Sequence, residues 1–497
     1  MLSSADFRIA FLSGAFPDER IELVGALGRE SLSALFELEI YLTRDGEEFS
    51  SAELDALLAA PCAVALGPDP GDILHGILES VRMIDGSGNL MPRYLATMVP
   101  SAWLLTQART NRIFQEITVP AMVESILVQY GLKAGEDFEI LVSGSYPPRE
   151  YVVQYEETDW DFIQRWLEAE GIFYWFDHAG ARDKLVISDT NARSTPIAAP
   201  KAVSYRGRNN LGAGGESTVW EWALTQTRVP ARVAVYDYNY RTPHLRLIGK
   251  APVDAARGFG TVMYYNEHFK TEAEGAGVAR VRAEQILCAR RVFSGWTDCP
   301  RFRAGHVFEL MDHYDATNDG EYLITSIEHR VGHGILPGSE AISATAEGTL
   351  EPYKARFEAI PLAVQYRPPR VTPWPTIRGV LHAHVDSEDA GEYARIDASG
   401  RYKIRLPFDS GNAGPGLASR WMRLAQPYAG AAYGSHQPLH KGAEVLVVHN
   451  DGDPDRPMLL GSVPHAHTVS PVTSPNATQS VTHTPSGIRV ELEDLES

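Results

Sequence analysis

The stretch Tyr146–Phe176, YPPREYVVQYEETDWDFIQRWLEAEGIFYWF, is the most informative part of this chain. It divides into a strand, a helix and a second strand, with almost no residue left over. Tyr151, Val153 and Tyr155 occupy alternate positions, and a period of two is typical of a β-strand. Ile172–Phe176 is dense in aromatic and β-branched residues, which favours a buried strand.

Between these strands the sequence predicts a helix with defined ends. Thr158 stands three residues before Asp161, which is the spacing of a capping box, whose oxygens accept hydrogen bonds from the first helical turn. Gly171 ends the helix, because a residue without Cβ tolerates the left-handed cap conformation. Apolar residues recur on one helical face: Phe162, Ile163, Trp166 and Leu167.

Length and composition indicate a folded protein of three or four domains. The chain has 497 residues, of which 44% are apolar and 22% charged, as in ordinary globular proteins. Its 45 basic and 64 acidic residues give a formal net charge of −19. That charge argues against a nucleic-acid groove, which needs clustered Lys and Arg, and against docking on anionic lipid.

The cysteines and the N-terminus predict a reducing compartment and no classical export signal. Cys62, Cys288 and Cys299 are odd in number, and no two have the CxxC spacing of a zinc or redox site. The first 20 residues lack a basic n-region and a continuous apolar core, so we do not expect a signal peptide. No stretch approaches the roughly 18 apolar residues of a membrane span.

Most of the chain has the sequence pattern of β-structure, in which turn-forming residues separate short apolar runs. Short apolar runs between Gly, Pro, Asp and Asn predict strands at Phe36–Tyr41, Cys62–Leu66, Tyr94–Val99, Lys184–Ile187, Arg232–Tyr238 and Tyr322–Ile327. Helical spacing is confined to three segments: Pro120–Tyr130, Trp160–Glu170 and about Thr271–Arg291. The chain is therefore expected to be mainly β with inserted helices.

A proline-rich segment at Arg367–Pro375 separates the first three quarters of the chain from the rest. Arg367–Pro375 cannot continue a sheet interior, so we place the main domain boundary there. Ile377–Val463 carries strand signals over the length of a small barrel. Val469–Ser486 is rich in Ser, Thr and Pro and predicts an extended segment, and Gly487–Asp494 then alternates strictly between apolar and charged residues.

Motifs along nearly the whole chain resemble one family, the VgrG spike proteins of type VI secretion systems. The stretch quoted at the start resembles the core signature of that family. The other matching segments are the LHGI of 74–77, the VPSAWLL of 99–105, the RIFQ of 112–115, the YDY of 236–238 with Pro243, the YY of 264–265, the GEYLITSIEHR of 320–330 and the VHNDGDPDRPMLLGSV of 448–463.

The resemblance implies a fold and an oligomeric state. Residues 1–370 would form a phage hub-like domain with two tube-like β-barrels and inserted helices. An OB-fold domain would follow at 371–466, and residues 467–497 would form a linker and the start of a triple-stranded β-helix needle. By this resemblance the protein is a homotrimer. Needles in the family have many alternating strands after the OB-fold, whereas the given sequence contains about one, so it represents either a short needle or part of a longer one.

The resemblance also implies a function and partners. The protein would be the structural spike of the secretion system, would cap a tube of hexameric Hcp rings, and would meet baseplate proteins. A PAAR-repeat tip protein and effectors would sit at the needle end. The spike would assemble in the bacterial cytoplasm and then be secreted or injected. The hub-spike of a phage tail or related contractile particle stays open as an alternative, and so does a carbohydrate-binding or carbohydrate-active protein.

The alternating strand at Ile488–Leu492 gives a physical reason for three copies. A lone strand leaves its backbone groups unpaired and its apolar row in water. Winding three copies about one axis would pair those edges and enclose Ile488, Val490 and Leu492. His483 would then lie near the axis, where three copies of one histidine could meet a metal.

Catalytic and metal patterns are weak, and we predict no catalytic, cofactor-binding or metal residues. The chain has no HExxH, GxSxG or GxxxxGK motif. Asp451, Asp453 and Asp455 alternate as in a calcium loop, but the downstream Glu is missing. We read DGDPDRP, residues 451–457, as a tight turn in which Arg456 pairs with an aspartate.

The remaining residues considered for chemistry have simpler explanations. The carboxylate pairs, Glu156 with Glu157 and Glu168 with Glu170, are expected on the solvated side of the helix and at its start. The aromatic residues of 160–176 are expected to pack in a core. The histidines that stand close in sequence are expected at the surface rather than on a metal: His382 and His384, His436 and His440, and His465 and His467.

Overall fold

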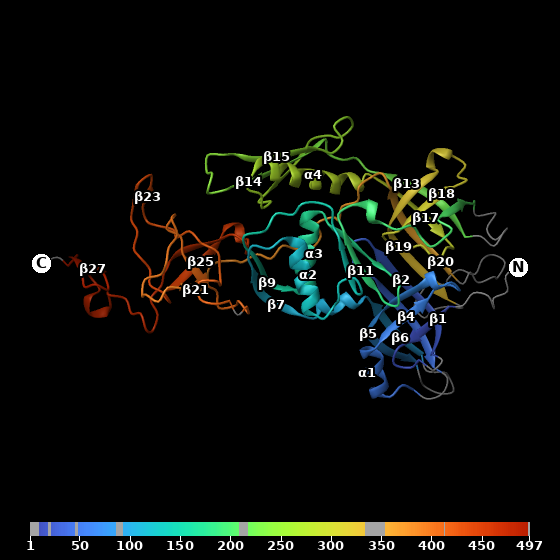
Figure 1. Cartoon of the computed structure of the whole chain (residues 1–497), viewed down its shortest axis with the longest axis horizontal. Helices are drawn as coiled ribbons and strands as arrows, with labels where there is room; N and C mark the ends of the chain where they lie inside the picture. Colours follow the sequence, from blue (N-terminus) through green and yellow to red (C-terminus); the bar gives the residue numbers. More distant parts are fainter. Residues whose placement is uncertain are drawn as a thin grey trace. The chain divides into compact units, whose positions relative to one another are not determined.

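A computed structural model describes residues 9–17, 21–44, 48–85, 93–207, 217–332, 353–411 and 413–495. Residues 1–8 and 18–20, which belong to the N-terminal segment discussed above, lie outside the described residues. The chain forms two compact units (Figure 1). Unit 1 comprises Met1–Ala108, Val119–Pro147 and Thr158–Pro373, and unit 2 comprises Arg109–Thr118, Pro148–Glu157 and Trp374–Ser497.

Unit 1 is built on a sheet of twelve strands, made of two halves of six. In sheet order, the first half is β1 (Ala10–Ser13), β4 (Pro61–Ala65), β5 (Ile73–Asp85), β6 (Arg93–Val99), β3 (Glu37–Arg44) and β2 (Ile21–Ser31). The second half is β19 (Gly320–Gly332), β18 (Val307–Met311), β12 (Ala202–Tyr205), β13 (Thr218–Gln226), β17 (Arg291–Thr297) and β20 (Tyr353–Pro361).

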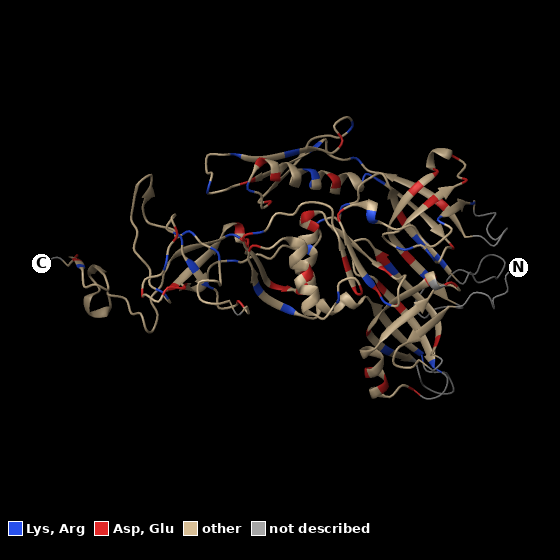
Figure 2. Cartoon of the chain, in the orientation of Figure 1, with Lys and Arg blue, Asp and Glu red and all other residues tan. Residues whose placement is uncertain are grey.

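Strand β19 joins the two halves and closes one of them. Its first residues pair with β18, whereas Ser326–Gly332 pair with β2 of the other half. Its second edge pairs with β20 from Tyr322 to Val331, so the second half closes into a barrel of six strands. Closure removes the exposed edges that an open sheet would leave. Basic and acidic residues both occur along these strands (Figure 2).

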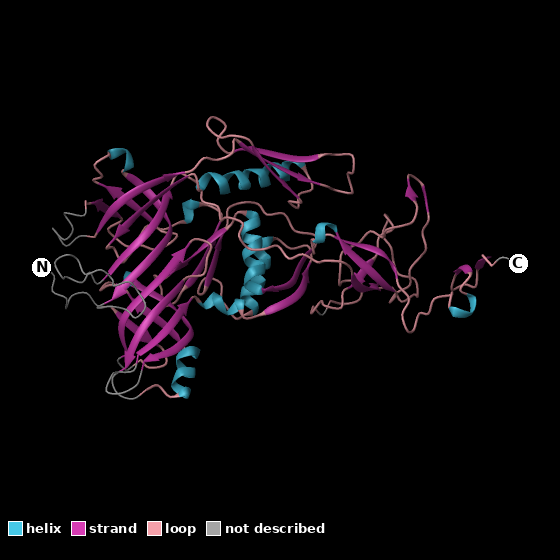
Figure 3. Ribbon diagram, turned by 180° about the vertical axis from the view of Figure 1, so that it is seen from behind, coloured by secondary structure: helices cyan, strands magenta, loops and turns pink. Residues whose placement is uncertain are grey.

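Helices and two small sheets complete unit 1 (Figure 3). The helices are α1 (Ser51–Ala59), α2 (Val119–Gln129), α3 (Asp159–Glu170) and α4 (Glu272–Cys288). One sheet has the order β10 (Phe173–Asp177), β11 (Lys184–Ser188), β8 (Phe138–Leu141), and the other has the order β15 (Leu247–Pro252), β14 (Arg232–Asp237), β16 (Thr261–Tyr265). Within the described residues, no helix is long and apolar enough to cross a membrane.

Unit 2 centres on a four-stranded antiparallel sheet. Its order is β22 (Lys403–Arg405), β21 (Leu381–Asp386), β25 (Glu444–His449) and β26 (Pro457–Ser462). Three two-stranded sheets accompany it: β7 (Arg109–Phe114) with β9 (Val152–Thr158), β23 (Ala429–Gly430) with β24 (Tyr433–Gly434), and β27 (Gln479–His483) with β28 (Arg489–Glu493). Short 3-10 turns lie at Pro70–Asp72, Ser101–Thr106, Asn191–Arg193 and Ala316–Asn318 of unit 1, and at Asn450–Gly452 and Ser474–Asn476 of unit 2.

Helix α3 has the ends that the sequence predicts. The Thr158 hydroxyl accepts the backbone N–H of Asp161 at 3.0 Å, and Gly171 adopts the left-handed conformation at φ 72°. All five residues from Ile172 to Phe176 are buried, as expected of an interior strand. The predicted aromatic core is confirmed, because Trp160 and Trp166 are buried as well.

The structure adds one helix and one strand pairing that the sequence did not predict. Helix α1 was not expected, although the Ser50 and Glu53 side chains form a full capping box of the kind recognised at Thr158. The segment Val469–Ser486, predicted to be extended, contains the strand β27, and its pairing with β28 in a hairpin was not predicted. Gly487, at φ 90°, allows the turn that folds these two strands together.

Replacing Gly171 by Val should prevent unit 1 from folding. A Cβ at this position would lie 2.5 Å from the Val281 Cγ1 atom, and the positive φ would strain any L side chain. We expect a loss of about 3 kcal/mol or more of unfolding free energy, from backbone strain and overpacking together. Soluble yield and thermal unfolding would measure it. Gly180→Val is the matched control, since a Cβ there meets open space; equal stability of the two variants would contradict the account.

Candidate assembly sites

The core of unit 2 includes a strand from the first third of the chain. Tyr151 and Val153 belong to a cluster of buried residues whose other members come from the four-stranded sheet and its surroundings. Those members are Ala383, Val385, Tyr402, Ile404, Leu406, Met422, Val445, Val447 and Leu459. Tyr155 also packs against this core, with its ring 5.4 Å from that of Phe408. The alternate residues of β9 thus fill one barrel core with the C-terminal strands.

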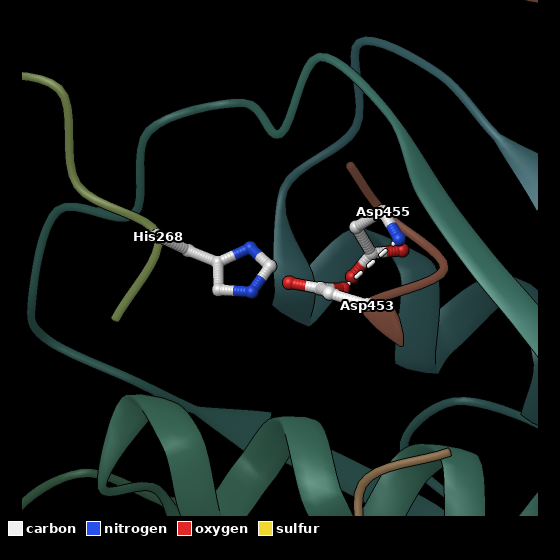
Figure 4. Close-up of side chains that lie close together, drawn as sticks. All are labelled: His268, Asp453 and Asp455. Atoms are coloured by element: carbon white, nitrogen blue, oxygen red, sulfur yellow. Dashed lines mark hydrogen bonds between the residues drawn. The ribbon is translucent and has the colours of Figure 1, made fainter. Parts of the chain in front are cut away.

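A buried carboxylate fixes strand β9 in this place. The Asp455 Oδ1 atom accepts the backbone N–H of Val153 at 2.6 Å. Asp453 Oδ1 in turn accepts the backbone N–H of Asp455 at 3.0 Å, as Figure 4 shows. Both aspartates are only 4% exposed, so these hydrogen bonds are shielded from water.

The turn at 451–457 therefore has a structural role in this unit. Arg456 Nε lies 3.6 Å from Asp453 Oδ2, which confirms the predicted pairing of this arginine with an aspartate. Asp451 and Gly452 both have positive φ, 55° and 74°, and the Gly452 carbonyl accepts the backbone N–H of Ile377. His268, which is also drawn in Figure 4, belongs to unit 1.

Arg420 holds the residues that precede Val153. Its guanidinium lies 5.4 Å from the centre of the Tyr151 ring and 3.6 Å from the Glu150 carboxylate. Burial raises the pKa of the Tyr151 hydroxyl, so this side chain stays neutral at physiological pH. A cation over an aromatic face and a partly shielded ion pair both favour the observed position of the strand.

A second candidate assembly site is the C-terminal hairpin of β27 and β28. Val490 pairs with Thr482, and Leu492 with Ser480, so these four side chains share one face. Ile488, Val490 and Leu492 are 65%, 56% and 66% exposed. An isolated two-stranded sheet is marginally stable in water, and an apolar row of this kind is typical of a surface that another chain covers.

A cluster of buried titratable groups lies inside unit 1. His329 Nε2 lies 2.6 Å from Glu30 Oε1, and its Nδ1 lies 2.8 Å from the Tyr353 hydroxyl. Burial lowers the pKa of His329, and a neutral ring that donates to Glu30 and accepts from Tyr353 satisfies both contacts. Burial opposes ionisation of Glu30, but His329 and the nearby Arg303 lower its pKa. All four side chains are buried, which suits a structural network.

His178 extends this network as a second buried, neutral histidine. Its Nδ1 accepts the backbone N–H of His75 at 3.1 Å, and its ring lies 5.5 Å from that of Phe36. Burial lowers the pKa of His178 to about 3. Protonation would place a charge in the core, and the nearby Glu30 carboxylate offsets the cost of burial only in part, so we expect this residue to oppose folding at acid pH.

A cavity of about 360 Å³ in unit 1 is lined by Cys62, Ser101 and Asp183, among other residues. Burial raises the pKa of the Cys62 thiol to about 12, so it is a poor nucleophile at neutral pH. The Ser101 hydroxyl donates to the Asp183 carboxylate at 2.8 Å. The Ser101 backbone N–H donates to the same carboxylate at 2.6 Å, and burial raises the pKa of Asp183 to about 6.

The glutamate pairs at 156–157 and 168–170 were expected to be exposed to solvent, but two of these four residues are buried. Glu168 is 1% exposed and does not lie on a solvated helix face, so that interpretation was wrong. Its carboxylate accepts the backbone N–H groups of Val371 and Thr372 at 2.9 and 3.0 Å. The helix is buried around this position because the chain returns to it about 200 residues later. Glu157 is buried too, whereas Glu156 is exposed.

The histidines that are close in sequence have individual surroundings. His382 Nδ1 lies 2.5 Å from the Glu444 carboxylate, and His436 contacts Tyr402 and Gln426. The rings of His465 and His467 are 6.0 Å apart. His483 lies on β27 opposite Arg489. The prediction that no residue of the chain is catalytic or binds a cofactor or metal stays a prediction.

Two family models match the chain. The model described as phage tail baseplate hub (GPD) matches residues 29–335. The model described as type VI secretion system/phage-baseplate injector OB domain matches residues 394–463. A tail hub that carries an injector OB domain is the class of protein that this fold defines.

Curated relatives narrow this class to one family. The type VI secretion system spike protein VgrG1c of Pseudomonas aeruginosa is 32% identical over 97% of this chain and 65% of its own length. VgrG1a of the same organism is 31% identical over 91% of this chain and 69% of its own length. The chain belongs to the VgrG family of spike proteins, and it spans about two thirds of these relatives. The actin cross-linking toxin VgrG1 of Vibrio cholerae is 29% identical, but only 36% of its length is matched.

Solved structures show the same fold. The Escherichia coli c3393 protein, a type VI secretion component that resembles the T4 tail proteins gp27 and gp5, is 23% identical with a TM-score of 0.64. It covers 91% of this chain, and 99% of its own chain is matched. A chain from a PdpA–VgrG complex is 9% identical, with a TM-score of 0.58 over 96% of this chain.

Substitution of Asp455 should destabilise unit 2 in a graded way. In Asp455→Ala the buried Val153 N–H loses its acceptor, which costs about 1–3 kcal/mol. Asp455→Asn keeps an oxygen acceptor and should lose less. Thermal and urea unfolding would measure both, with the exposed Asp389→Ala as control. If Asp455→Ala unfolds like Asp389→Ala, Asp455 does not hold strand β9.

The buried histidines should make stability fall in acid. An unfolded histidine titrates near a pKa of about 6.5, whereas His178 in the folded chain titrates near about 3. The unfolded state therefore binds more protons below pH 6.5, and stability falls as the pH falls. From pH 6.5 to pH 5 this residue alone accounts for about 2 kcal/mol.

His178→Asn keeps an acceptor for the His75 N–H but cannot titrate. Thermal unfolding of this variant between pH 7 and pH 5 should depend less on pH than that of the natural chain. The exposed His244→Asn is the control. An unchanged pH dependence in His178→Asn would exclude this residue as the source.

Proposed function

We propose that the chain is the subunit of a homotrimeric type VI secretion spike, in which the hub end caps the Hcp tube and the needle end carries tip and effector proteins. The single observation that carries the proposal is the exposed apolar row on β28, because this row needs partner strands to leave water. Membership of the VgrG family supports trimerisation around the same segment.

Capping of a hexameric tube fits the architecture of unit 1. Each chain has two six-stranded halves that share one sheet. Three chains would present six such halves, so a three-fold hub could match the six subunits of an Hcp ring. Baseplate proteins would contact the same hub. The match between the number of halves and the ring supports this proposal by geometry alone.

Tip and effector binding belongs at the other end of the spike. The C-terminal hairpin would begin the needle, and the tip protein of the PAAR class would bind beyond it. The solved complex of PdpA with a VgrG protein supports effector-type partners for such spikes. We infer that the chain acts by assembly rather than turnover, as expected of a member of a family of spike proteins. We infer that it is assembled in the bacterial cytoplasm and delivered by the secretion system itself.

The experiment that tests this proposal weakens the apolar row without touching the hub. Val490→Ser with Leu492→Ser should lower the trimer fraction, because burial of two aliphatic side chains contributes about 1.5–3 kcal/mol each. Sedimentation velocity over a range of concentrations would measure the dissociation constant. Val469→Ser removes a side chain that is 71% exposed outside the hairpin and serves as control. A doubly substituted chain as trimeric as the control would contradict a role for the hairpin in assembly.

A further inference from the structure

One sheet of unit 1 is covered on one face and open on the other. Helix α4 lies along the sheet β15–β14–β16 (Figure 1). The core between them contains Val233, Val235, Leu247, Phe269 and Ala279. The contact is close, since a Cβ on Gly249 would lie 1.9 Å from the carbonyl oxygen of Gly275 in the helix. This face of the sheet is therefore covered by helix α4.

The far side of helix α4 is occupied as well. Gln285 donates to the carbonyl oxygens of Glu168 and Pro368, both at 2.9 Å, and Glu284 pairs with Arg367 at 2.7 Å. The helix is thus a middle layer between the sheet and the end of α3. On the second face of the sheet most residues are exposed, whereas Tyr236 and Ile248 are half-buried and Ala234 is buried.

The register of the strands shows which side chains share the open face. Ala234 pairs with Lys250 and with Met263, and Tyr236 pairs with Ile248 and with Tyr265. Arg232 pairs with Pro252 and with Thr261 in the same way. Directly paired residues point to the same side of a sheet. The nine positions of this face are Arg232, Ala234, Tyr236, Ile248, Lys250, Pro252, Thr261, Met263 and Tyr265; we call them the open face.

The open face combines apolar exposure with positive charge. Met263 and Tyr265 are 67% and 61% exposed, and both lie on the edge strand β16. None of the nine residues is acidic. Arg232 and Lys250 have no ion-pair partner among the described residues. Arg246, next to the face, lies over the Tyr236 ring at 5.7 Å. Exposed Met, Tyr and Arg side chains of this kind are enriched at protein interfaces.

The charge of this module is opposite to that of the rest of the chain. Residues 228–270 contain seven Lys and Arg and three Asp and Glu, a net charge of 7 minus 3, or +4. The remainder of the chain then carries −19 minus 4, or −23. Two of the three acids are already paired within unit 1, Asp254 with Arg290 at 2.9 Å and Glu267 with Arg282 at 2.8 Å. These two carboxylates therefore do not neutralise the basic side chains of the open face.

We propose that the open face is a subunit contact that binds an acidic surface of a second copy of this chain. A closed ring of three needs a heterologous contact, in which each subunit presents two different surfaces. A basic, apolar face on an otherwise acidic chain supplies two such surfaces in one molecule. The proposal rests on the homotrimer proposed above and adds to it the face through which neighbouring hubs meet.

Charge reversal on the open face tests the proposal. Arg232→Glu with Lys250→Glu, in the full chain, should raise the trimer dissociation constant about tenfold or more, because like charges would then face each other. Arg193→Glu with Lys441→Glu makes the same change of net charge at exposed positions away from the face and should change it about twofold at most. Sedimentation velocity from about 10 nM to about 10 μM would measure all three chains.

Thiol labelling tests the same contact in a trimer that does not dissociate. The natural cysteines are buried, so a Met263→Cys thiol can be followed with a maleimide probe under native conditions. It should react at least about tenfold more slowly in the trimer than an Ala192→Cys thiol, an exposed control. Equal labelling of the two thiols in a trimer overturns the proposed face and leaves the homotrimer intact.

The outcomes separate this proposal from the one on which it rests. A natural chain that is monomeric throughout the concentration range contradicts the homotrimer itself. A trimer that is insensitive to charge reversal contradicts the face alone. If charge reversal instead abolishes binding of an oligodeoxythymidine probe and leaves the trimer unchanged, the face is a nucleic-acid surface and the proposal is wrong.

Discussion

The hydrogen bond from the Val153 N–H to the Asp455 carboxylate is the contact on which the organisation of this chain depends. It joins residues 302 positions apart inside a core that neither sequence segment could form alone. Because β9 runs directly into the cap of α3, the strand that completes the OB-type core is covalently continuous with a buried helix of the hub. A change at Asp455 therefore acts on one unit through a backbone donor, without altering any side chain of the hub.

Exposed apolar surface is the second physical constraint on this fold. Closure of β19 on β20 removes edges in the hub, but the C-terminal hairpin exposes an apolar row and the open face exposes Met263 and Tyr265 on an edge strand. Three-fold assembly would cover both kinds of surface. The buried Glu30–His329 network and His178 show that titratable groups in this chain are used in packing.

Much of the fold could be predicted from local sequence, because local rules determine helix ends and strand periodicity. The alternation of Tyr151, Val153 and Tyr155 identified β9, and Thr158 and Gly171 marked the ends of α3. The core that β9 joins could not be predicted, since no local pattern links Val153 to a carboxylate in the last fifth of the chain. Glu168 was misplaced for the same reason: its backbone partners at Val371 and Thr372 are distant in sequence. Helix α1 was different, because its Ser50–Glu53 capping box is visible in the sequence.

The measurement that tests the account most directly is the mass of the purified 497-residue chain in solution, by light scattering coupled to size-exclusion chromatography. Three chains of 54.7 kDa would give a mass of about 164 kDa, and the account predicts this value at micromolar concentration. A stable, folded species of 54.7 kDa under the same conditions would contradict it, because the apolar row of β28 and the open face would then remain in water without a partner.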